Sequence, residues 1–168
     1  MRKMIKYILI SISLLILIYI VSTFIIVYNF TKDGYRNSEA YIVEKSSDDL
    51  SYSIYRFKED NPKYKLFTSN EKGEIIYFKD YSSEKYYHVM FYFSDMNLTV
   101  QCLLDYKNAD SLECPFLLYS ISSGTNFGSW KDINTKDLSK DKNRMIKKKF
   151  ETEILNNLGK WKHKRWYN

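Results

Sequence analysis

The sequence is poor in cysteine, proline, glycine and alanine. It holds two cysteines, two prolines and five glycines in 168 residues, and alanine occurs only at Ala40 and Ala109. Cys102 and Cys114 are twelve positions apart and both histidines lie far from them, so the usual spacing of a zinc site is absent. We therefore expect neither a metal nor a cofactor. This composition, rich instead in lysine, isoleucine and tyrosine, is typical of an AT-rich bacterial genome.

Sequence signatures of enzymes are also missing. The chain contains no Gly-x-Ser-x-Gly of serine hydrolases and no His-Glu-x-x-His of zinc proteases. The segment Ser123–Ser129 carries two glycines, but it lacks the Gly-Lys-Ser/Thr ending of a phosphate-binding loop. We interpret it as a connecting loop, and the sequence as a whole predicts a protein without enzymatic activity.

One enzymatic alternative stays open, a small hydrolase that acts on envelope polymers. Its candidate residues are His88, Asp95, Asp105, Asp110 and Glu113. Acidic residues at the ends of neighbouring hairpins can form the carboxylate pair that acid–base catalysis needs. Solvated turn residues and a structural histidine in an aromatic strand are the favoured interpretation.

Aromatic residues are abundant, with 16 tyrosines and 10 phenylalanines. Buried rings remove large apolar areas from water, so this content argues against disorder. The 138 residues after position 30 are enough for one compact domain and too few for two ordinary ones.

The chain begins with a long uncharged run. Residues 7–30 contain no charged side chain and are dominated by isoleucine, leucine and valine. A helix of this length reaches about 36 Å, which exceeds the roughly 30 Å hydrocarbon core of a bilayer. We predict that Tyr7–Phe30 is a transmembrane anchor in contact with membrane lipid. A cleaved signal peptide is disfavoured, because its apolar core is shorter and ends in a small-residue cleavage site.

The charges around this run predict its orientation. Arg2, Lys3 and Lys6 crowd the short tail 1–6, and the positive-inside rule places such a tail in the cytoplasm. The remaining domain is then periplasmic or extracellular, as in a single-pass protein of the cell (inner) membrane.

The two cysteines fit an oxidising compartment. A hairpin centred on Asn108 would place Cys102 directly opposite Cys114, where the Cβ separation suits a disulfide. Two buried free thiols are the alternative. We predict the disulfide, because a domain outside the cytoplasm meets oxidising conditions.

The domain outside the membrane is expected to be α+β. We assign residues 31–49 to a linker or short helix and residues 50–168 to the domain. Short stretches with strand composition and tight connections predict an antiparallel meander of about five or six strands. They are 50–58, 64–69, 74–80, 86–94, 98–106 and 114–122.

The last element is expected to be an amphipathic helix. Ile146, Phe150, Ile154 and Leu158 recur every four residues. Ser139 has the character of an N-cap, and Gly159 lies where a helix terminator is expected. The predicted fold is therefore a sheet followed by a C-terminal helix.

The charge is uneven along the chain. Residues 31–139 hold 13 basic and 17 acidic residues, whereas residues 140–168 hold 10 basic and 3 acidic ones. Basic residues that alternate with aromatic ones suit an acidic protein partner or anionic lipid, and nucleic acid is disfavoured outside the cytoplasm. The candidate contacts with a partner or lipid are Lys147, Lys148, Lys149, Trp161, Lys164, Arg165, Trp166 and Tyr167. A solvated helix face and a frayed end are the alternative.

A small anchored domain without an active site is typical of a protein that binds another protein. One version is an immunity or inhibitor protein that intercepts a toxin. An accessory subunit of a membrane-spanning envelope assembly, such as a secretion or pilus system, is the main alternative. Both interpretations rest on general likeness, because no family is recognised from the residues.

Overall fold

The computed structural model describes residues 12–22, 35, 37–105, 111–125 and 128–164. The chain divides into two compact units, Met1–Arg36 and Asn37–Asn168. In the first unit, residues 12–22 form a helix. Within the described residues, no helix has the length and apolar character needed to cross a bilayer. The other residues of the expected span 7–30 lie outside the described part, so the anchor stays a prediction.

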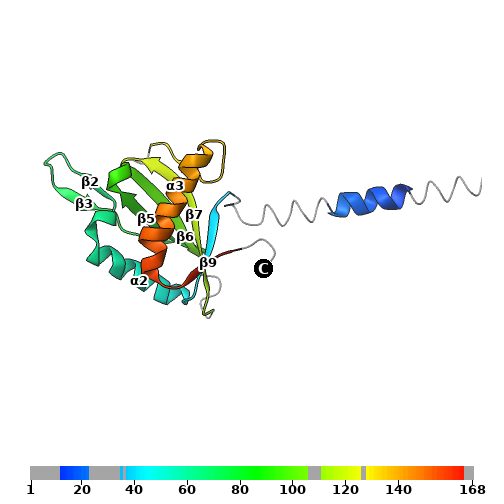
Figure 1. Cartoon of the computed structure of the whole chain (residues 1–168), viewed down its shortest axis with the longest axis horizontal. Helices are drawn as coiled ribbons and strands as arrows, with labels where there is room; N and C mark the ends of the chain where they lie inside the picture. The colour runs from blue at the N-terminus through cyan, green and yellow to red at the C-terminus, as the bar shows by residue number, and fades with distance from the viewer. Residues whose placement is uncertain (1–11, 23–34, 36, 106–110, 126–127, 165–168) are drawn as a thin grey trace, which may run out of the picture. The chain divides into compact units, whose positions relative to one another are not determined.

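The second unit is built on a seven-stranded antiparallel sheet with the strand order β4-β5-β6-β7-β1-β9, while β8 also pairs with β7 (Figure 1). β2 and β3 form a separate two-stranded hairpin. The fold is therefore α+β with an antiparallel sheet and a C-terminal helix, as expected. The strands of the main sheet are β1 (Glu39–Val43), β4 (Tyr81–Ser82), β5 (Tyr86–Phe93), β6 (Leu98–Asp105), β7 (Cys114–Ser123), β8 (Lys131–Asp132) and β9 (Trp161–His163), and the hairpin strands are β2 (Phe67–Ser69) and β3 (Ile75–Tyr77).

Two helical segments cover one face of the sheet (Figure 1). The first is α2 (Ser47–Asp60), and the second is α3 (Lys140–Phe150) with its continuations η3 (Glu151–Leu155) and α4 (Asn156–Leu158). Short 3₁₀ turns, η1 (Pro62–Tyr64) and η2 (Ser94–Met96), follow α2 and β5. The helices and the inward side chains of the strands enclose one hydrophobic core.

Phe150 lies at the centre of that core. Its ring centroid is 5.7 Å from Tyr41, 6.2 Å from Phe91 and 5.6 Å from Phe116, and all four side chains are fully buried. These neighbours come from β1, β5 and β7. One side chain of α3 therefore joins three strands of the sheet.

The predicted C-terminal helix is confirmed. The Ser139 side chain accepts a hydrogen bond from the Lys142 N–H, and Gly159 ends the helical segment at φ = 143°. The prediction missed the strand that follows this helix: Trp161–His163 forms β9 at the edge of the sheet beside β1.

Two predictions near the start of the domain are wrong. Residues 50–58 belong to α2 and not to a strand, because Ser46 caps the helix and buried Leu50, Ile54 and Lys58 recur at four-residue spacing. Residues 39–43, assigned to a linker or short helix, form β1 between β7 and β9. The compact unit begins at Asn37 and not at residue 50.

The central meander of β5, β6 and β7 is confirmed by its pairing. The connection after η2 ends at Asn97, which has φ = 45°, and the β2–β3 connection contains Gly73 at φ = 78°. Asparagine and glycine are the residues that adopt this left-handed conformation most readily.

Candidate functional site

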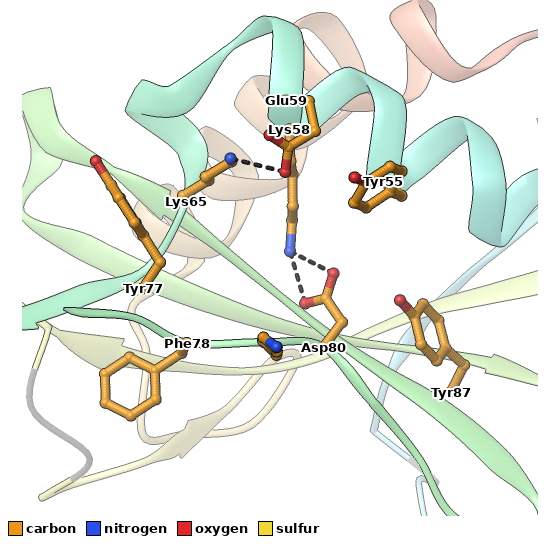
Figure 2. A pocket seen from close by; sticks show the side chains of 9 residues that line it. Tyr55, Lys58, Glu59, Lys65, Tyr77, Phe78, Asp80 and Tyr87 are labelled. Carbon is orange, nitrogen blue, oxygen red and sulfur yellow. Dashed lines mark hydrogen bonds and ion pairs between the residues drawn. The ribbon is translucent and has the colours of Figure 1, made fainter.

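A groove of about 490 Å³ lies between α2 and the segment that links β3 to β4, and we call it the α2 groove. Tyr55, Lys58 and Glu59 of α2 form one wall, and β5 contributes Tyr87 (Figure 2). A groove of this volume is in the range that binding sites occupy. The other lining residues are Lys65, Tyr77, Phe78, Lys79 and Asp80.

The floor of the α2 groove is a buried ion pair. Lys58 Nζ donates to both carboxylate oxygens of Asp80 at 2.6 and 2.7 Å, and the two side chains are 9% and 10% exposed. The ammonium group also lies 4.7 Å from the centre of the Phe91 ring. Burial lowers the pKa of Lys58, and the charge of Asp80 opposes that shift. The pair holds α2 against the edge of the sheet.

A second ion pair neutralises the mouth of the groove. Lys65 Nζ lies 2.8 Å from the carboxylate of Glu59, and its ammonium group is 5.5 Å from the centre of the Tyr77 ring. Both acidic residues of the lining are paired to lysines, so Lys79 is its one remaining charged residue, and the other lining side chains are aromatic. Such a lining favours apolar or aromatic groups over nucleic acid.

Exposed aromatic side chains surround the groove, and we call them the aromatic rim. Tyr55 and Tyr77 are 54% and 48% exposed. Large apolar side chains at the surface of a small domain mark interaction sites when they gather in one region. The rim comprises Tyr55, Tyr77 and Phe78.

The rim was not predicted from the sequence. Its members come from α2, β3 and the segment after β3, and only the fold brings them together. The one available signal was the abundance of tyrosine. The abundance of tyrosine does not show where the rings gather, and the assignment of residues 50–58 to a strand places Tyr55 on the wrong element.

The predicted basic contacts on α3 are largely engaged within the domain. Lys147 Nζ lies 2.9 Å from a carboxylate oxygen of Glu39, and Lys149 Nζ donates to Asp95 at 2.8 Å. Lys149 also donates to Glu153 at 2.5 Å. Lys148 is exposed. The three lysines therefore do not form a free basic patch, and their role in partner binding stays a prediction.

The predicted partner or lipid contacts beyond α4 lie partly inside and partly outside the described residues. Trp161 is part of β9, and its indole N–H donates to Asn156 at 2.9 Å. Lys164 is exposed, and its backbone N–H donates to the Ala40 carbonyl at 2.9 Å. Trp161 is thus a structural residue of the sheet edge. Arg165, Trp166 and Tyr167 lie outside the described residues.

A polar cluster locks β9 and the C-terminal helix onto β1. The buried Tyr41 hydroxyl donates to Glu151 at 3.0 Å, and burial followed by the Glu151 charge raises the pKa of Tyr41. The His163 ring nitrogens lie 3.4 Å from Glu39 and 3.6 Å from Glu151. Burial raises the pKa of Glu39, but the hydrogen bonds from Lys147 and Asn134 and the charges of Lys147 and His163 together outweigh it, and the net shift is downward. We interpret these contacts as structural, because they attach the edge strand β9 to β1 and to the C-terminal helix.

The predicted pairing of the cysteines is wrong. Cys102 lies opposite Leu118, and Cys114 lies opposite Val43 of β1. Cys114 is four residues from Leu118, which is about 13 Å along the strand and beyond the reach of a disulfide. Both cysteines are buried free thiols in this structure. Burial raises the pKa of Cys102, and it raises that of Cys114 to about 11.

The candidate acid–base residues do not gather. Asp95 lies in the turn at one end of the β5–β6 hairpin, and Asp105 lies at the other end, about 23 Å away along β6. Glu113 pairs with Lys162 at 2.7 Å, and Asp110 lies outside the described residues. Asp95 and Asp105 therefore do not form the carboxylate pair that the hydrolase alternative requires.

His88 lies apart from these carboxylates. Its ring stacks on Tyr81 with centroids 4.5 Å apart, and its Nε2 lies 3.2 Å from the Ser83 hydroxyl. Its Nδ1 is buried without a hydrogen-bond partner. Burial lowers the pKa of His88. Within the described residues, no carboxylate orients this ring as a catalytic base would require, and no group of three metal-binding side chains occurs.

Comparison with known proteins adds no relative: no family model, no curated protein and no solved structure matches the chain. The functional argument therefore rests on the α2 groove and its aromatic rim.

Proposed function

We propose that this chain is a membrane-anchored extracytoplasmic module that binds another protein through the α2 groove and the aromatic rim. The supporting observation is the gathering of exposed aromatic side chains around a groove whose ion pairs are internal. Tyrosine is among the residues most enriched in the energetic centres of protein interfaces. The groove then receives an apolar or aromatic side chain of the partner, and the rim surrounds it.

The partner under this proposal is a protein met outside the cytoplasm. An immunity or inhibitor protein that intercepts a toxin is the preferred version, because such a protein acts by occupying its target and needs no catalytic group, and the candidate residues described here assemble none. An accessory subunit of an envelope assembly is the alternative. Replacement of residues 7–30 by an unrelated anchor separates the two, since an inhibitor tolerates the swap and an assembly subunit does not.

The binding surface is tested by site-specific photo-cross-linking. The full chain carries benzoylphenylalanine in place of Tyr55, and in a parallel sample in place of Met145, which is exposed on α3. We expect one dominant cross-linked protein in envelopes of the host or of competing strains, formed from position 55 and not from position 145. Cross-linking of the same proteins from both positions would contradict the proposal.

Substitutions give the matching energetic test. Tyr55→Ala and Tyr77→Ala are each expected to weaken capture of that protein about thirtyfold, the effect of losing roughly 2 kcal/mol. Leu112→Ala, which removes an exposed apolar side chain outside the rim, is the control and leaves capture unchanged.

A further inference from the structure

The lining of the α2 groove carries more positive than negative charge. Its three lysines outnumber its two acidic residues. Asp80 is bound to Lys58 on the floor of the groove, and Glu59 is bound to Lys65 at its mouth. The third lysine, Lys79, is exposed and has no hydrogen-bond or ion-pair partner among the described residues. Its ammonium group is therefore available to a ligand.

A hydroxyl group on the opposite wall is available in the same way. Figure 2 shows the Tyr55 hydroxyl on α2 directed into the groove. It has no hydrogen-bond partner within the part of the chain that the structure describes. An ammonium group has donors and no acceptor, and a phenol hydroxyl can donate as well. A ligand group that satisfies both Tyr55 and Lys79 must therefore be a hydrogen-bond acceptor.

The charges also decide against a cationic ligand. Aromatic rings can bind a cation, but lysines of the domain already lie over two of the rings in this region. Lys58 Nζ is 4.7 Å from the centre of the Phe91 ring, and Lys65 Nζ is 5.5 Å from that of Tyr77. The charge of Lys79 repels a further cation. Among protein side chains, aspartate and glutamate are the acceptors that carry negative charge near neutral pH.

We propose that the segment of the partner protein that enters the α2 groove carries an acidic residue beside its aromatic side chain. The aromatic side chain packs against the aromatic rim, and the carboxylate accepts hydrogen bonds from Lys79 and Tyr55. This inference rests on the proposed function, because it names the chemistry of the partner at the same site. An exposed ion pair contributes little affinity, so the carboxylate acts mainly on specificity.

Two short blocked peptides that differ in one side chain test the acidic residue. Both contain para-fluorophenylalanine, followed by aspartate in one peptide and by asparagine in the other. Fluorine NMR of each peptide measures its binding to the full chain in detergent micelles, and binding to empty micelles is subtracted. We expect the aspartate peptide to bind about fivefold more tightly. Equal affinities would overturn the acidic residue and leave the proposed function standing, because both peptides would still occupy the groove.

Lys79→Gln identifies the cation that the carboxylate meets. We expect this variant to bind the two peptides with equal affinity. Lys72→Gln is the matched control, because it removes the same charge from the exposed turn between β2 and β3, outside the groove lining. It should keep the fivefold preference, and Tyr55→Phe, which keeps the ring and loses the hydroxyl, should reduce the preference to about twofold. A preference that survives Lys79→Gln, or that Lys72→Gln abolishes equally, would overturn the proposal.

Failure of the proposed function gives a different result in the same experiment. If neither peptide binds, or if both bind Tyr55→Ala as tightly as the unaltered chain, the groove does not receive an aromatic side chain and both proposals fall. Para-fluorophenylacetate, an aromatic acid without a peptide backbone, separates a protein segment from a small ligand. We expect it to bind more weakly than the aspartate peptide. Equal or tighter binding of this acid would overturn a protein segment as the occupant.

Discussion

Lys58 and Asp80 form the one ion pair among those described in which both side chains are at most 10% exposed, with Nζ–O distances of 2.6 and 2.7 Å. Asp80 also accepts the Met90 N–H at 3.2 Å. One carboxylate therefore joins α2 to β5. Removing one member of such a pair leaves a buried charge without compensation, which costs more than the intact pair contributes.

Asp80→Asn is expected to lower the free energy of unfolding by about 3–5 kcal/mol, because Lys58 then keeps its burial and loses its counter-charge. Urea denaturation measures the effect. Glu59→Gln, at the more exposed Lys65 pair, is the control and should cost no more than about 1 kcal/mol. Similar losses in the two variants would show that Asp80 is not the anchor of α2.

The stability of the domain should fall in alkali. The Tyr64 hydroxyl donates to Glu153 at 2.9 Å, and burial, followed by this hydrogen bond, raises the pKa of Tyr64 to about 12. The unfolded chain releases this proton near pH 10, so the folded state binds more protons between about pH 10 and 12 and loses stability as the pH rises.

Tyr64→Phe should therefore make the free energy of unfolding less dependent on pH across that window. Urea denaturation at several alkaline pH values gives the slope for each protein. Tyr41, whose pKa is also raised, still contributes in the variant, so the slope is reduced and not abolished. An unchanged slope would mean that Tyr64 does not titrate with folding.

The two native thiols should stay reduced and inert in the folded protein. Their raised pKa values leave little thiolate near neutral pH, and burial blocks access. We expect iodoacetamide to modify neither cysteine under native conditions and both after denaturation, as read by mass spectrometry. Recovery of a peptide with a Cys102–Cys114 disulfide would contradict the strand register.

Phe150→Ala should destabilise the domain strongly, by about 3–5 kcal/mol, because it opens a cavity between α3 and three strands. Met145→Ala, on the exposed side of the same helix, should change stability by less than about 0.5 kcal/mol. Thermal denaturation compares the two. A small effect of Phe150→Ala would mean that the core closes around the missing ring.

Elements with a strong local pattern were predictable from sequence. The C-terminal helix has a cap, a four-residue apolar repeat and a terminator, and β5–β7 have the composition of strands, with a short turn between β5 and β6. In both regions local preference and tertiary packing favour the same structure.

The failures have a different physical origin. Residues 50–58 contain aromatic and isoleucine side chains, which favour strands. They form a helix because Ser46 caps it and because α2 packs against β6. The cysteine register failed because Cys102 and Leu104 of β6 pair with Leu118 and Phe116 of β7, so the hairpin is not centred on Asn108. The α2 groove could not be predicted from the sequence, because its walls come from separate elements.

The place of β1 in the sheet has a consequence for synthesis. This strand pairs only with β7, about 70 residues later in the chain, and with β9, near the far end. Its apolar residues Tyr41 and Val43 therefore leave the ribosome long before their partners exist, whereas β5, β6 and β7 pair with their immediate successors. Until β7 has emerged, β1 therefore has no strand to pair with, whereas β5 and β6 already have each other.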